Sequence, residues 1–371
     1  MIAFAYLVPA VACLALHFLF GYEGKWTAYL IILGTGELTV GLLHYLFMRR
    51  LTYATEYLGS IITSIHYEEP WTELVRRTRT YTDKNGKTHT TTYIEHRYHP
   101  EQHYFFTTTG SRFDTDGEYF AKVRSIWSVE PRFDQWRGSQ IRGGVRYGHH
   151  YSFEDLPVPQ TENPNNWIPV TETHRYKNKI HNSNSIFRFQ EIGEHLKEKY
   201  GLFDYPHIAG YDAPCILSRF HNVPTSADVM FRRFNGRFAP EAQMRLYILL
   251  FDAALGPGAS EIQRAYWHGG NKNEFTVCLG LDEAGKIVWA RTFSWADEQT
   301  LERETDMWLM QHPVLDWESF YNWLRLNIHR WNRKQFKDFD YLYVALPLRY
   351  FLIILFLTIA ESVVAICIAL S

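Results

Sequence analysis

Three segments of the chain are almost free of charge, and the sequence between the second and the third is polar. The apolar segments are residues 2–22, 27–48 and 344–370. A helix needs about 20 mostly apolar residues to cross the hydrocarbon core of a bilayer, and each segment is long enough. Only residues 23–26 separate the first two, which indicates a helical hairpin. The pattern predicts three transmembrane helices.

A cleaved signal peptide is the alternative interpretation of the first segment. That segment lacks a basic stretch at its start, and a second apolar segment follows at once. We therefore expect residues 1–50 to form a transmembrane hairpin and residues 344–370 to form a third span.

The basic residues beside the spans predict their orientation. All but one of the 38 Lys and Arg residues lie within 49–349, and Arg49 and Arg50 directly follow the second span. Because Lys and Arg accumulate in cytoplasmic loops next to spans, the N-terminus and residues 50–343 are expected in the cytoplasm. The C-terminus is then expected outside, with the protein in the inner or plasma membrane.

Residues 51–190 carry mainly β signals. The start, 51–67, is compatible with a short amphipathic helix that continues the second span. Residues 71–82 and 88–98 are rich in Thr and aromatic residues, and they flank Asn85-Gly86, which strongly indicates a hairpin. A type I′ turn there would give both residues positive φ. Further strands are expected in 103–113, 172–180 and 184–192, and long loops with short strands in 130–180.

Residues 191–340 alternate between helical and strand patterns. Helices are expected at 190–201, 226–238, 258–270, 296–311 and 316–336, and strands at 244–252, 274–282 and 287–295. A β-α-β-β-α order of this kind is typical of an α/β sandwich. The expected fold class is an α+β integral membrane protein with a β-rich module (51–190) and an α/β module (191–340).

Part of the α/β module resembles the TPM domain, a family of small, often membrane-anchored α/β domains. The resemblance lies within residues 246–295, in LYILLFD, YWHGGNKNEFTVCLGLD and KIVWARTFSW. It implies an α/β fold for this stretch. The turn of that family usually carries acidic residues that can bind calcium, whereas this turn reads Asn271-Lys272-Asn273-Glu274. A calcium site is therefore not carried over.

The overall composition excludes some classes of protein. The 40 acidic and 38 basic residues give a net charge of −2, so no global field favours nucleic acid. An aromatic content of 16% argues against disorder. The four cysteines form no CxxC pair and require no disulfide framework.

The string from Trp267 to Glu274 contains a candidate ligand site. Consecutive glycines, Gly269 and Gly270, allow backbone amides to converge on an anion, and Asn271 and Lys272 add a polar group and a cation. The competing interpretation is a helix C-cap that leads into a strand.

Three histidines form a candidate zinc site. His96, His99 and His103 lie close together in sequence with two glutamates, and imidazole is a common zinc ligand. HExxH is absent, and a polar hairpin edge explains the same residues. The metal interpretation is the less favoured one.

Two carboxylates lie near the middle of apolar segments. Glu37 and Glu361 would each cost roughly 2.5–3.5 kcal/mol at the centre of a bilayer. Such residues usually serve as ion or proton sites or as contacts between subunits, and the alternative is hydrogen bonding between packed helices.

These patterns favour a non-enzymatic membrane protein over an enzyme. In the first interpretation the chain forms a homo-oligomer, its cytoplasmic region binds a protein or a small ligand, and its spans conduct or signal. The alternative is a membrane-bound, metal-dependent hydrolase with its site in the β-rich module. GxSxG, Walker A and GxGxxG motifs are absent.

Overall fold

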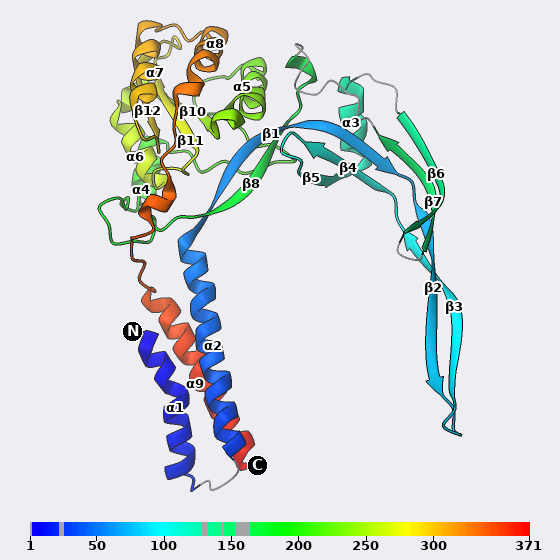
Figure 1. The fold of residues 1–371 in the computed structure, drawn as a ribbon. Coiled ribbons are helices and arrows are strands. Elements are labelled where there is room, and N and C mark those ends of the chain that lie inside the picture. Colours follow the sequence, from blue (N-terminus) through cyan, green and yellow to red (C-terminus); the bar gives the residue numbers. More distant parts are fainter. Residues whose placement is uncertain (1, 22–25, 128–131, 142–143, 153–163) are drawn as a thin grey trace.

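The computed structural model describes residues 2–21, 26–127, 132–141, 144–152 and 164–371. Figure 1 shows a bundle of three helices that holds both termini, an α/β region above it, and a β-rich region that extends to one side. The chain is a mixed α/β protein, as the sequence predicts.

The bundle consists of α1 (Ile2–Phe18), α2 (Trp26–Thr52) and α9 (Leu348–Leu370). By length and composition, α2 and α9 are able to cross a membrane. α1 ends at Phe18 and has 17 residues, fewer than the span expected over 2–22. Gly36 of α2 allows close packing on α1, because a Cβ there would lie 2.4 Å from Cγ of Pro9.

The helix considered for residues 51–67 is wrong, because α2 ends at Thr52 and β1 (Tyr53–Glu68) follows directly. β1 is rich in Tyr, Ile and Thr, which suit a half-buried strand. Its first nine residues pair with β8 (Pro169–Lys177), and from Ile62 onward it pairs with β4 (Gln102–Thr107). These partners lie far away in sequence, so the local pattern does not contain the signal for them.

The hairpin expected at 71–98 is confirmed as β2 (Trp71–Thr82) and β3 (Thr88–His99). Its turn is not type I′, since Gly86 has a φ of +75° but Asn85 lies outside the positive region. The Asp83 carboxylate instead accepts the amides of Asn85 and Lys87, both at 2.9 Å. We call this hairpin the arm. It projects from the far end of the β-rich region and is well separated from the helix bundle in Figure 1.

The rest of the β-rich region is a six-stranded sheet of order β5-β4-β1-β7-β6, with β8 also paired to β1. Residues 103–113 contain parts of two strands, β4 and β5 (Arg112–Thr115). α3 (Gly117–Trp127) packs on this sheet through an apolar core. β6 (Arg132–Ile141) and β7 (Gly144–Ser152) form the sheet's other end. The loops expected in 130–180 lie partly outside the described residues.

The α/β region is built on a four-stranded sheet of order β12-β11-β10-β9. β9 (Ile216–Ser218), β10 (Arg245–Asp252) and β11 (Glu274–Leu281) are parallel, and β12 (Ile287–Ser294) is antiparallel to β11. Alternate residues of β10 and β11 enter two separate apolar cores, so both faces of the sheet are covered. The covering helices are α4 (Glu194–Tyr200), α5 (Thr225–Arg237), α6 (Gly258–Tyr266), α7 (Thr300–Gln311) and α8 (Trp317–Asn327).

The three expected strands of this region are confirmed, but four helices are shorter than expected. α4 begins at Glu194 rather than at residue 190, and α6 ends at Tyr266 rather than at residue 270. α8 ends at Asn327 rather than continuing to residue 336, and α7 begins at Thr300. The chain before α7 pairs with the chain after α8 in an extended conformation, and the Asp297 amide donates to the Asn332 carbonyl at 2.9 Å. The strand expected within 184–192 is also wrong, because no residue there is in a strand.

Candidate functional site

The predicted ligand residues Gly269 to Lys272 lie in the turn between α6 and β11. Gly269 and Gly270 have φ values of +88° and +76°, which favour glycine. Their amides donate to the carbonyls of Arg264 and Trp267, so they close the C-terminus of α6. The structure therefore places these two amides in helix capping, with no geometry that converges on an anion.

Asn271 belongs to a buried polar cluster that joins this turn to β8. Its Oδ1 accepts a hydrogen bond from the Tyr176 hydroxyl at 3.1 Å, and its Nδ2 donates to Glu274 Oε1 at 2.7 Å. The Tyr205 hydroxyl donates to the same Glu274 carboxylate. Burial raises the pKa of Glu274 above its ordinary value. Asn271 is paired with polar groups inside the fold, which gives it a structural role.

Lys272 links the same turn to β1. Its ammonium lies 3.3 Å from the carboxylate of Glu56 and 4.6 Å from the centre of the Tyr176 ring. The Glu56 side chain is only 8% exposed, so this ion pair is largely shielded from water. Glu56 follows α2 by four residues. The pair therefore fixes the α/β region to the strand that continues α2.

The three histidines of the candidate zinc site do not converge. His96 and His99 lie on the arm, whereas His103 lies on β4 in the neighbouring sheet. His99 stacks on Trp71 with ring centres 4.1 Å apart and contacts Glu73 at 3.2 Å. Across the described ranges, no three His, Cys, Asp or Glu side chains form a group that could hold a metal ion.

The two carboxylates of the bundle differ in their exposure. Glu37 is exposed on α2, and Glu361 is half-buried on α9. Among the residues that the structure describes, neither carboxylate forms an ion pair or a hydrogen bond. The packed face of α2 instead contains Ile32, Gly36 and Val40.

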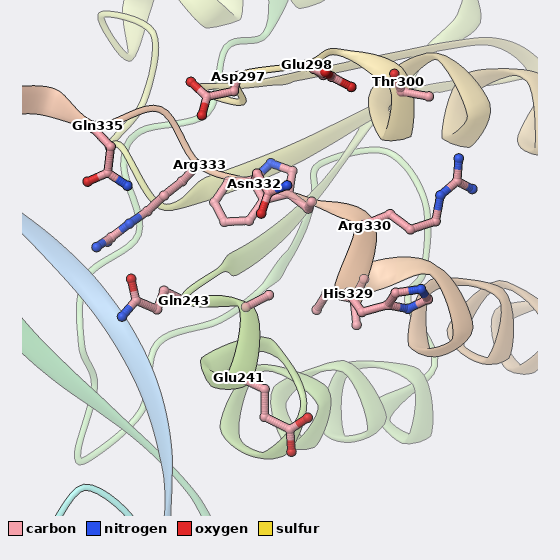
Figure 2. Close-up of a pocket in the computed structure, with 13 residues that line it drawn as sticks. Glu241, Gln243, Asp297, Glu298, Thr300, His329, Arg330, Asn332, Arg333 and Gln335 are labelled. Carbon is pink, nitrogen blue, oxygen red and sulfur yellow. The ribbon is translucent and has the colours of Figure 1, made fainter. Parts of the chain in front are cut away.

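An open cavity lies on the α/β region, and we call it the polar pocket. Its volume is about 730 Å³. Three short segments meet around it: the turn after α5, the start of α7, and the chain after α8, which is a 3-10 turn followed by extended residues (Figure 2). The lining residues are Glu241, Ala242, Gln243, Asp297, Glu298, Thr300, Ile328, His329, Arg330, Trp331, Asn332, Arg333 and Gln335.

Charges of both signs line the polar pocket, and some are already neutralised. Arg330 holds Glu304 through two contacts of 2.5 and 2.6 Å, and Glu241 pairs with Arg237. In the described part of the chain, Arg333, Asp297 and Glu298 form no ion pair. These groups, with the side-chain amides of the pocket, are available to a ligand that carries both acidic and basic groups.

Sequence reasoning missed the polar pocket because its walls come from three separated segments. Their only local signal is the basic and aromatic stretch at 327–337. That stretch alone indicates contact with lipid headgroups, and nothing in it shows that Asp297 and Glu241 lie opposite.

Comparison with known proteins finds no relative of this chain. No family model matches the chain, and neither a curated protein nor a solved structure matches it.

Proposed function

We propose that this chain is a non-enzymatic integral membrane protein whose α/β region binds a polar small molecule and passes that event to its membrane helices. The bundle of α1, α2 and α9 is the anchor. The N-terminus and residues 50–343 lie in the cytoplasm, and the C-terminus lies outside. Arg49, Arg50 and Arg349 at the body-side ends of the helices support this orientation.

One observation carries the link between pocket and membrane: the chain that lines the polar pocket continues into α9. Residues 328–335 form one wall, and residues 336–347 lead from there to α9. Trp331, inside that wall, is buried, and its indole donates to the Ser294 hydroxyl at 3.1 Å. A ligand that changes the position of this wall therefore acts on the segment that enters α9.

The wall of the polar pocket that faces residues 328–335 connects to α2. Gln243 and Ala242 follow α5, which packs on β1, and β1 is the direct continuation of α2. The polar pocket thus lies between the segments that lead to α2 and to α9. This placement favours signalling over catalysis, as does the absence of a hydrogen bond from His329 or Thr300 to another side chain in the described ranges.

The ligand that fits these walls is a zwitterion. Its anionic end would contact Arg333, and its cationic end would contact Asp297 and Glu298. The test is calorimetric titration of the detergent-purified full chain with triglycine, with glucose as the uncharged control. Triglycine should bind, and Asp297→Asn with Glu298→Gln should weaken it at least tenfold. Equal binding by wild type and variant, or none by either, would refute this ligand class.

The membrane location has a separate test. In a bacterial host, an alkaline phosphatase fusion at the C-terminus should be active, and one placed after Thr55 should be inactive. Resistance of the chain to carbonate extraction should accompany that pattern. The reverse activity pattern would overturn the orientation, and extraction by carbonate would overturn the membrane location.

A homo-oligomer is part of the same proposal. An exposed carboxylate at the middle of α2 is costly against lipid, so a second copy is expected to cover Glu37. Light scattering in detergent should show an oligomer that Glu37→Gln shifts to another size. A monomeric wild type would remove this part of the proposal, and with it a conducting path lined by Glu37 or Glu361.

A further inference from the structure

A second, smaller cavity lies beside the polar pocket, and we call it the basic cavity. Its volume is about 230 Å³. Five of its lining side chains are cations and one is a carboxylate. The residues are Tyr176, Lys177, Lys272, Arg333, Lys334, Gln335, Phe336, Lys337 and Asp340.

Within the part of the chain that the structure describes, three of the five cations have no counter-charge. Lys177 pairs with Asp340 at 3.0 Å, and Lys272 pairs with Glu56. Arg333, Lys334 and Lys337 form no ion pair with any residue in the described ranges. Because like charges around a small cavity repel one another, an anion bound there would remove an unfavourable interaction.

The basic cavity lies at the body-side end of α2 and on the segment that leads to α9. Lys177 is paired in register with Tyr53, the first residue after α2. Next to it, the Asn178 amide donates to the Thr52 carbonyl at 2.7 Å. Lys334 and Lys337 belong to the chain that descends to α9 in Figure 1. The cavity is therefore on the same side of the bundle as Arg49 and Arg50.

We propose that the basic cavity binds a phosphate group. A phosphate is small enough for about 230 Å³, and its oxygens suit the fork of Arg333 and the point charges of two lysines. Tyr176 and Phe336 supply an apolar floor that accepts the carbon atoms next to a phosphoester. The bound phosphate group can belong to an anionic lipid headgroup or be free phosphate. If the bundle lies in a membrane as proposed above, the cavity is at headgroup level, which favours the lipid.

The test measures binding to the full chain in a neutral detergent, so it does not depend on the orientation of the helices. Calorimetry is run with dioctanoyl phosphatidic acid, with inorganic phosphate and with dioctanoyl phosphatidylcholine as the zwitterionic control. Wild type should bind phosphatidic acid, and binding should weaken as sodium chloride is raised. Lys334→Gln with Lys337→Gln should weaken it at least tenfold. Neither lysine lines the polar pocket, so triglycine binding should be unchanged.

A matched control is Lys286→Gln in the turn between β11 and β12. Lys286 is exposed and lies at the opposite end of β11 from Lys272. This variant should bind phosphatidic acid like wild type. Unliganded melting temperatures check that each variant folds, and Lys337→Gln alone replaces the double variant if the latter does not.

Each outcome decides the proposal. Tighter binding of phosphatidic acid than of phosphate, lost in the double variant, supports a lipid headgroup site. Equal binding of both, lost in the same variant, supports a site for free phosphate. No binding of either probe, or binding that the double variant retains, overturns the site. If carbonate extracts the chain but the binding results are as expected, the membrane location is wrong and the phosphate site is still supported.

Discussion

Gly59 is the position where β1 crosses α5, and Gly59→Ala tests whether that crossing holds the α/β region to the strand that continues α2. A Cβ at Gly59 would lie 2.0 Å from the carbonyl oxygen of Asn235 and 2.6 Å from its carbonyl carbon. Both are backbone atoms, so no side-chain rotation relieves the contact. Either β1 or α5 must move by more than 1 Å to restore a normal separation of about 3.4 Å.

The fixed position of α5 sets the magnitude of the effect. The buried Asn235 side chain donates to the Leu246 carbonyl at 3.0 Å and accepts its amide at 2.8 Å, which ties α5 to β10. Moving α5 would strain both hydrogen bonds. Added methyl groups in packed interiors typically cost 1–3 kcal/mol, and we expect about 3 kcal/mol here. For a domain of about 150–250 residues this lowers the melting temperature by about 6–12 °C.

Differential scanning calorimetry of the detergent-purified chain measures this shift. Gly258→Ala is the control, because a Cβ at Gly258, the first residue of α6, meets no atom within 4 Å. It should leave the melting temperature unchanged or raise it slightly. Equal melting temperatures for Gly59→Ala and Gly258→Ala would refute the close packing of β1 on α5.

Three further predictions concern single side chains. Lys272→Met leaves the Glu56 carboxylate buried without its cation and should lower the free energy of unfolding by about 3 kcal/mol, whereas adding Glu56→Gln should restore most of it, as measured by urea denaturation. An unchanged midpoint in the single variant would contradict the ion pair. Burial raises the pKa of Asp306 from 3.8 to about 6, so the protonated form contributes stability at low pH that is lost as the pH rises through 6. Between pH 4 and pH 7, the free energy of unfolding of wild type should therefore fall by about 2 kcal/mol relative to that of Asp306→Asn. Parallel curves of this free energy against pH for the two proteins would refute this. Gly86→Ala places a Cβ at a φ of +75° and should cost about 1 kcal/mol in the arm alone, seen as faster tryptic cleavage at the arm's turn with the main melting transition unchanged.

The sequence predicts elements well where a strand or helix carries its own periodic pattern. β10 and β11 are continuous apolar runs, and α6 shows an apolar face with glycines at its end, so their types and approximate bounds follow from the residues. Residues 53–68 carry no such clear period. Their hydrogen bonds come from β8 and β4, which lie more than 30 residues away, and tertiary pairing therefore decides between helix and strand.

The candidate sites show the same limit more strongly. Asn271 and Lys272 stand out in the sequence, yet their partners, Tyr176 and Glu56, come from the β-rich region and give them structural roles. The polar pocket depends on residues from three segments up to about 90 positions apart. A local motif does not show which distant side chains complete a cavity. In addition, α8 ends at Asn327, so the residues after it, which line the polar pocket, are not part of that helix.

The continuity of α2 with β1 makes the β-rich region a lever. No loop separates Thr52 from Tyr53, and β1 is hydrogen-bonded along its 16 residues. At about 3.3 Å per residue, β1 is roughly 50 Å long. Because β1 is curved, a tilt of about 5° where it leaves α2 would move its far end by at most about 4 Å. The arm begins three residues beyond that end, so a small reorientation of α2 becomes a displacement several ångströms in size at the tip of the arm.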